Sequence, residues 1–289
     1  MEFYYKKINA KRFTLYPLGD FHIGSAQCNE DFIRATVAEI RDNPEALWVG
    51  MGDMMENAIV GSKSDVYTQT LPPKEQMEYI VDMLMPIKDK GLFLIAGNHE
   101  QRTMRVVGLI PEQFISLQLG LPYKGFSCLA VFNLMKAKNP QSFSMFFHHN
   151  YGGGYTPGGK VNRAQQPRKI CPTVDATFSG HFHITSRMPV TWYAPGYTQV
   201  IKHVGYDYIT GSALEWDNSY AEEKCKPPAV TEFIKVTFIG TTSGNADNRK
   251  QIYEVITPGG GMGGGRMEEG KGGRKGEKKG GRKGEGKGG

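Results

Sequence analysis

Apolar runs of strand length alternate with segments of helical periodicity along the first half of the chain. Two segments have apolar residues at helical spacing, one at 29–42 and one that begins after Pro72. Five short apolar runs have the length of buried strands, and they cover residues 13–18, 47–51, 92–96, 143–147 and 174–178. Segments 190–210 and 230–256 are β-rich in composition. This order predicts an α/β first half and a more β-rich second half.

Polar residues that can bind a metal ion or a phosphate follow each of the five apolar runs. In open α/β sheets, the ligand crevice lies outside the carboxyl ends of the strands. Six of the seven histidines lie in these clusters, which structural histidines alone explain poorly. We therefore expect the clusters to converge on one site, although they are far apart in the sequence. They comprise Asp20 and His22, then Asp53, then Asn98, His99 and Glu100, then His148 and His149, then His181 and His183.

The types of side chain in this set indicate which metals would bind. Imidazole and carboxylate without thiolate suit Mn, Fe, Zn, Co or Ni better than Ca, and we expect Mn first. Seven or eight ligands are too many for one ion with an open position and suit two divalent metal ions. Two cations about 3.5–4 Å apart can hold both the attacking and the leaving oxygen of a phosphoryl displacement. One carboxylate should bridge them, because it neutralises two cations at once.

The order of these motifs, D-x-H, GD, GNH[DE], H and GH-x-H, resembles that of the calcineurin-like metallophosphoesterases. The similarity covers roughly residues 18–183, and the full ordered set is far more specific than any single motif. It implies a four-layer α/β/β/α sandwich of two mixed β-sheets with helices outside, which we assign to residues 1–257. In this chain the motifs read Asp20-Phe21-His22, Gly52-Asp53, Gly97-Asn98-His99-Glu100, His148 and Gly180-His181-Phe182-His183.

The resemblance also implies a role for each residue. The first metal would be held by Asp20, His22, Asp53 and His183, and the second by Asp53, Asn98, His148 and His181, with Asp53 bridging. His149 stays open as the alternative to His148. His99 would be catalytic rather than a ligand, protonating the leaving group or stabilising charge, while a metal-bound hydroxide attacks the phosphate. Glu100 would either position His99 or serve as a carboxylate favoured at a helix N-terminus.

The substrate is less clearly indicated. Ser/Thr protein phosphatases of this family carry GD-x-x-D-R-G, whereas this chain has GDMMENA, so the phosphate-binding Arg is missing. Arg102 follows GNHE, and the Gly-rich segment 151–169 carries Lys160 and Arg163, so these cations either contact the substrate or are merely solvated. We therefore expect a phosphodiesterase or nuclease acting on DNA or RNA. The alternatives are a phosphomonoesterase on a small molecule or nucleotide, and a non-enzymatic nucleic-acid-binding protein.

Composition separates the C-terminal tail from the rest of the chain. Residues 259–289 hold nine Lys or Arg and four Glu, hence +5 of the net charge of +6, which leaves +1 for the body. The segment 258–289 is Gly-rich and repeats KGGRKGEK-like units, so we expect it to be disordered, either as a contact for nucleic acid or as a solubilising extension. No run of 18 apolar residues, no apolar leader and no Cys-x-x-Cys pair occurs, so we expect a reduced cytoplasmic protein without a membrane span.

Overall fold

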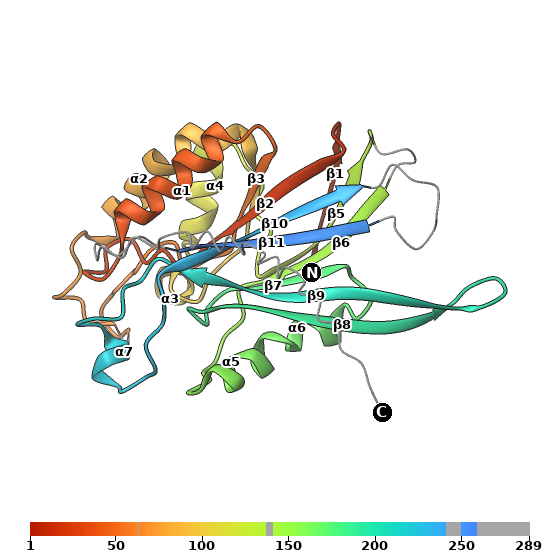
Figure 1. Ribbon diagram of the computed structural model, residues 1–289. Helices are drawn as coiled ribbons and strands as arrows, with labels where there is room; N and C mark the ends of the chain where they lie inside the picture. The colour runs from red at the N-terminus through yellow and green to blue at the C-terminus, as the bar shows by residue number, and fades with distance from the viewer. Residues whose placement is uncertain (63, 137–140, 241–249, 259–289) are drawn as a thin grey trace, which may run out of the picture. The chain divides into compact units, whose positions relative to one another are not determined.

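A computed structural model describes residues 1–62, 64–136, 141–240 and 250–258. The described residues form a mixed α/β fold with a large curled sheet (Figure 1). The expected tail lies outside them except for Pro258, so its disorder stays a prediction. Within the described residues, no helix has both the length and the apolar character needed to cross a membrane. All four cysteines have free thiols.

The predicted strands and the two predicted helices occur close to where the apolar pattern places them, and the structure adds strands at 2–8 and 127–134 and further helices after residue 84. The strands are β1 (Glu2–Ile8), β2 (Arg12–Leu18), β3 (Ala46–Gly50), β4 (Gly91–Leu94), β5 (Ser127–Leu134), β6 (Gln141–His148), β7 (Ala176–Ser179), β8 (Thr185–Pro195), β9 (Val200–Ser212), β10 (Glu232–Gly240) and β11 (Lys250–Pro258). The helices are α1 (Glu30–Asp42), α2 (Pro73–Leu84), the 3-10 helix η1 (Met85–Lys90), α3 (Glu100–Val107), α4 (Pro111–Leu119), α5 (Pro157–Ala164), α6 (Gln166–Ile170) and α7 (Tyr220–Glu223).

The ends of the helices follow from local chemistry. Asn29 begins α1 by accepting a hydrogen bond from the amide of Phe32 on its side-chain oxygen. Pro73 opens α2, where a missing amide hydrogen costs nothing. Gly108 ends α3 with φ 72°, a conformation that glycine adopts without strain. These caps set the positions of the helices against the sheet.

The strands pair along one continuous path, in the order β1-β5-β6-β7-β9-β10-β2-β3-β4, with β8 added on β9 and β11 on β10. The two halves of the path meet where Gly211 and Ser212 of β9 pair with Phe233 and Glu232 of β10. The structure therefore has one curled mixed sheet, where the sequence led us to expect two separate sheets. The short pairing between β9 and β10 joins the two halves of the sheet, and the apolar pattern of the sequence does not predict this pairing.

Curling brings side chains from both ends of the strand order into one core. Tyr4 of β1 packs on Phe93 of β4 with ring centroids 5.0 Å apart, and Phe13 of β2 packs on Phe132 of β5 with centroids 5.5 Å apart. A second core lies between β2 and β3 and the helices α1, α2 and α4, with Trp48 fully buried. Figure 1 shows α1, α2 and α4 grouped together, with α5 and α6 elsewhere on the sheet.

Parallel pairing aligns the strand ends that matter for the site. β2, β3 and β4 run parallel to one another, and so do β6 and β7. Their carboxyl ends therefore lie at the same edges, and the polar clusters that follow them are brought within reach of each other. Segment 151–169, which follows β6, folds into α5 and α6 instead of remaining a long loop.

Candidate metal centre

The backbone at the strand ends adopts a conformation that side-chain-bearing residues rarely accept. Positive φ angles occur at Asp20 (52°), His22 (52°), Asp53 (48°), His181 (73°) and His183 (52°). Such residues cost about 1–3 kcal/mol each and persist only where neighbouring structure holds them. Here backbone bonds between the loops hold them, because the amide of Asp20 donates to Gly52 and the amide of His22 donates to Asp53. Strain is thus concentrated at the residues that the sequence singled out.

Two glycines allow the loops after β3 and β4 to cross in direct contact. A Cβ on Gly52 would lie 2.3 Å from the amide nitrogen of Gly97, and a Cβ on Gly97 would lie 2.2 Å from Oδ1 of Asp53. Any larger residue would separate the loops. The G of GD and the G of GN therefore set the distance between Asp53 and Asn98.

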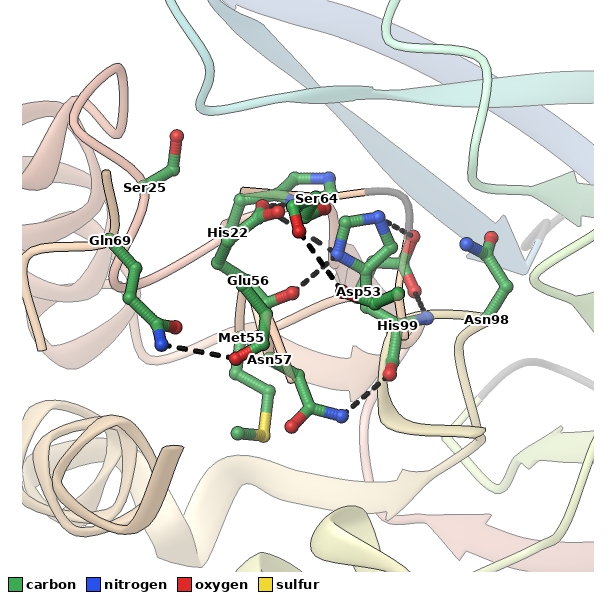
Figure 2. Close-up of polar contacts among 12 residues, drawn as sticks. His22, Ser25, Asp53, Met55, Glu56, Asn57, Ser64, Gln69, Asn98 and His99 are labelled. Carbon is green, nitrogen blue, oxygen red and sulfur yellow. Dashed lines mark hydrogen bonds and ion pairs between the residues drawn. The ribbon is translucent and has the colours of Figure 1, made fainter. Parts of the chain in front are cut away.

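The first ligand group consists of Asp20, His22 and His183. Nε2 of His183 lies 3.2 Å from Oδ1 of Asp20 and 3.2 Å from Nε2 of His22. Nδ1 of His22 lies 3.1 Å from Oε2 of Glu56 (Figure 2). A carboxylate only accepts, so the hydrogen of His22 is on Nδ1 and the lone pair of Nε2 points at the other two residues. This is the arrangement by which a carboxylate orients a metal-binding histidine.

The second ligand group consists of Asp53, His149 and His181, with Asn98 beside it. Nε2 of His149 lies 3.1 Å from Oδ2 of Asp53 and 3.1 Å from Oδ1 of Asn98. Nδ1 of His149 is 2.7 Å from the carbonyl of Met51 and carries a hydrogen. Its Nε2 faces two acceptor oxygens and carries the proton that a cation would replace. Nε2 of His181 donates to the carbonyl of Gly152 at 2.9 Å, which leaves its Nδ1 as the ligand atom.

These residues fit divalent cations because acceptor atoms face one another in a buried space. Oδ2 of Asp53 and Nδ1 of His181 are buried and make no hydrogen bond. Burial lowers the pKa of His149, but the carboxylates of Asp53 and Asp20 outweigh it and raise this pKa to about 10. The centre therefore attracts positive charge, which a proton supplies at His149 and a cation would supply more fully.

His149, not His148, lies in the second group, which corrects our first choice of ligand. Phe143, Met145 and Phe147 of β6 point into the core between the sheet halves, and His149 continues their alternation. His148 has the opposite parity, stacks on Phe146 and accepts a hydrogen bond from the amide of Asn150. Alternation along β6 was the signal in the sequence that could have decided this.

His99 lies beside both groups, but its ring is already engaged. Its Nδ1 donates to the carbonyl of Glu56 at 2.7 Å, and its Nε2 accepts from Nη2 of Arg102 at 2.8 Å. Burial, which outweighs the carboxylates of Asp53 and Glu56, lowers the pKa of His99 to about 4. His99 is therefore neutral near pH 7. With His22 and Asp53 it also forms a third group of potential ligand atoms, all within 4.8 Å of one another.

Glu100 and Glu112 hold the two crossing loops. Oε1 of Glu100 accepts from the amide of Met54 at 2.8 Å, and its Oε2 accepts from the amide of Asp53 at 3.1 Å. Glu112 accepts from the amide of Gly97 at 2.8 Å. Glu100 is the first residue of α3, as the helix N-terminal alternative expected, and its carboxylate also fixes the turn at Asp53 rather than the ring of His99.

The cations expected to contact the substrate differ in how far their side chains are exposed. Arg102 is turned inward, donating to Ser64 and to the carbonyl of Glu56 as well as to His99. Arg163 is exposed on α5, and Lys160 on the same helix is half-buried. Arg168 is buried in an ion pair with Asp207, so it supports the fold rather than binding a substrate.

Glu56 is the residue that the sequence pattern left without a role, and its replacement tests the first group. Burial opposes ionisation, but the hydrogen bond and charge of His22 lower the pKa of Glu56 to about 2. We expect Glu56→Ala to weaken Mn²⁺ binding by roughly 10–100-fold, because His22 loses the group that orients it. Isothermal titration calorimetry with Mn²⁺ measures the affinity, with Glu75→Gln on the exposed face of α2 as the control. Unchanged affinity in Glu56→Ala would show that His22 needs no such partner.

Comparison with known proteins adds little to this geometry. No protein-family model and no curated protein matches the chain. Among solved structures, Vps29 of Chaetomium thermophilum aligns with 87% of this chain and 97% of its own, at 9% sequence identity and a TM-score of 0.38. A likeness this weak carries no argument. The candidate metal centre rests on its own residues.

Proposed function

We propose that the protein is a metal-dependent phosphoesterase of the calcineurin-like type, which hydrolyses phosphodiester bonds in nucleic acid. One observation carries the proposal: the ends of four strands bring two neighbouring groups of buried carboxylate and imidazole ligands together. The groups are neighbours because His22 of the first and Asp53 of the second both belong to the third group, with His99. The ordered motifs support the same family.

Two cations suit the seven ligands that converge. Asp20, His22 and His183 would hold one, while Asn98, His149 and His181 would hold the other, with Asp53 between them. Bound there, divalent cations such as Mn²⁺ would lower the pKa of a water molecule and offset negative charge on the phosphate. The chain itself positions these ligands. Buried carboxylates orient the ligand side chains, and the crossing loops after β3 and β4 hold Asp53 and Asn98 at a fixed distance.

His99 and Arg102 form the pair that we place against the phosphoryl group. Because His99 is neutral, it cannot attract the negative charge of a phosphate, and its Nε2 accepts a hydrogen bond from Arg102. Arg102 supplies the positive charge, and its guanidinium is held in place by bonds to segment 56–64. In this proposal Arg102, which follows the third motif, takes the place of the Arg that is missing after the second.

The activity is tested on metal-loaded protein with three substrates, an aryl phosphodiester, an aryl phosphomonoester and DNA. We expect the diesters to be hydrolysed in Mn²⁺ and the reaction to stop on addition of EDTA. Faster hydrolysis of the monoester would favour the phosphomonoesterase alternative. If all three substrates stay intact with the metal fully bound, the proposal fails.

His99→Ala separates a catalytic role from a ligand role. We expect turnover to fall by roughly 10²–10³-fold, because Arg102 loses the ring that helps to position it against the phosphoryl group. Metal content should stay near that of the wild type, because the two ligand groups remain intact. Steady-state rates on the aryl phosphodiester and metal analysis of the same preparation measure the two effects. Loss of metal in His99→Ala would instead assign His99 to the centre as a ligand.

A further inference from the structure

Two exposed tyrosines lie directly beside the candidate metal centre. The carbonyl of Gly152 accepts from Nε2 of His181, so the backbone next to Tyr151 is attached to a proposed ligand. Tyr151 is 71% exposed and Tyr155 is 61% exposed. Only Gly152, Gly153 and Gly154 separate them, so both exposed rings lie on one short segment that is bonded to His181.

Segment 150–155 is held in a defined shape. Asn150 adopts a φ of 75°, and its side-chain oxygen accepts from the amide of Tyr151 at 3.0 Å. Its side-chain nitrogen donates to the carbonyl of Arg163. At the other end, the hydroxyl of Tyr155 donates to the carbonyl of Lys224 at 2.7 Å. The tyrosines are therefore presented by a fixed turn, which lowers the entropic cost of binding a ligand on them.

Positive charge accompanies the two rings. A Cβ on Gly152 would lie 3.9 Å from the guanidinium carbon of Arg163, so this cation is adjacent to Tyr151. Lys160, one turn earlier on α5, is half-buried, and burial together with the nearby charge of Lys226 lowers its pKa. Lys224 pairs with Glu223 and contributes no net charge. An anionic ligand would offset the repulsion between Lys160 and Lys226 and would be attracted to Arg163 as well.

We propose that Tyr151, Tyr155, Lys160 and Arg163, which we call the Tyr151 surface, bind single-stranded nucleic acid, with bases stacked on the tyrosines and phosphates on the cations. An exposed aromatic ring beside a cation can stack on any base of a single strand, because each base has an aromatic face. In a duplex these faces are covered by the neighbouring base pairs and are not available to the tyrosines. The surface would lead a strand to the metal centre. This inference rests on the proposed function and names its substrate class.

Binding is measured by fluorescence anisotropy in Mn²⁺ with a phosphorothioate-linked single-stranded DNA, which resists hydrolysis. We expect Tyr151→Ala to raise Kd by roughly 10-fold, and Tyr151→Phe to stay within about 2-fold, because the ring and not the hydroxyl stacks. Tyr197→Ala is the matched control. Tyr197 is fully exposed at the turn between β8 and β9, and the 11 residues of β8 separate it from His183 by about 35 Å.

An abasic strand with the same backbone separates stacking from charge. Tyr151→Ala should leave Kd for this strand unchanged, whereas Arg163→Ala should weaken both strands and reduce the salt dependence by about one charge. A duplex of the same sequence should bind more weakly than the single strand. Equal loss on the normal and abasic strands, no loss in Tyr151→Ala, or preference for the duplex would each overturn the inference.

Hydrolysis of unmodified single-stranded DNA by the wild type distinguishes the two proposals. Tyr151-dependent binding without hydrolysis would reject the phosphoesterase and keep the Tyr151 surface. Hydrolysis with binding that does not depend on Tyr151 would keep the phosphoesterase and reject the Tyr151 surface.

Discussion

Asp53→Asn is expected to remove bound metal and to lower hydrolysis of an aryl phosphodiester by roughly 10³-fold or more. Oδ2 of Asp53 is buried and lies 3.1 Å from Nε2 of His149, and the proposed function places this carboxylate between the two cations. Asn keeps the shape, tolerates the positive φ and can still accept from the amide of His99, but it cannot neutralise cations. Metal analysis and initial rates on one preparation measure both effects.

The control for this variant is Asp82→Asn, which removes a carboxylate from an exposed position on α2. It should change neither metal content nor rate. Full metal content in Asp53→Asn would show that Asp53 is not a ligand, and a normal rate in metal-depleted protein would contradict metal-dependent hydrolysis altogether.

His149→Ala and His148→Ala form a pair of neighbouring substitutions with opposite expected results. His149→Ala should lose the second metal and lower the rate by roughly 10²–10³-fold, because Nε2 of His149 faces Asp53 and Asn98. His148→Ala should keep both the metal and the rate on a small aryl diester to within a few-fold, because its ring lies on the other face of β6. Metal content per chain is the deciding measurement.

The reverse result would restore the sequence-based choice of ligand. Loss of metal in His148→Ala with retention in His149→Ala would mean that the ring of His148 turns toward the centre when cations bind. Equal loss in both would point to a disturbed strand end, and circular dichroism on each variant would detect that disturbance.

The positions of the site residues could be predicted from the sequence because short-range rules govern them. Apolar runs mark where strands end, and parallel strands end at a common edge, so Asp20, Asp53 and His181 were expected to converge. Alternation along β6 also favours His149, since it shares the parity of Phe147. His148 was preferred instead, whereas the structure places His149 in the group of potential ligand atoms with Asp53 and His181.

The remaining features depend on contacts between distant segments, which no local pattern encodes. Glu56 meets His22, and Arg102 meets the carbonyl of Glu56, only after the loops after β2, β3 and β4 come together. The β9–β10 pairing that makes the sheet continuous involves two residues on each strand. Long-range pairing of this kind is set by packing of the whole core rather than by the propensity of either strand.

The left-handed backbone at five of the site residues has a consequence for thermal stability. Asp20, His22, Asp53, His181 and His183 each carry backbone strain that glycine would relieve. In metal-free protein we therefore expect His181→Gly to be inactive and to melt at a higher temperature than the wild type. Selection for activity and selection for heat resistance would act in opposite directions at these positions.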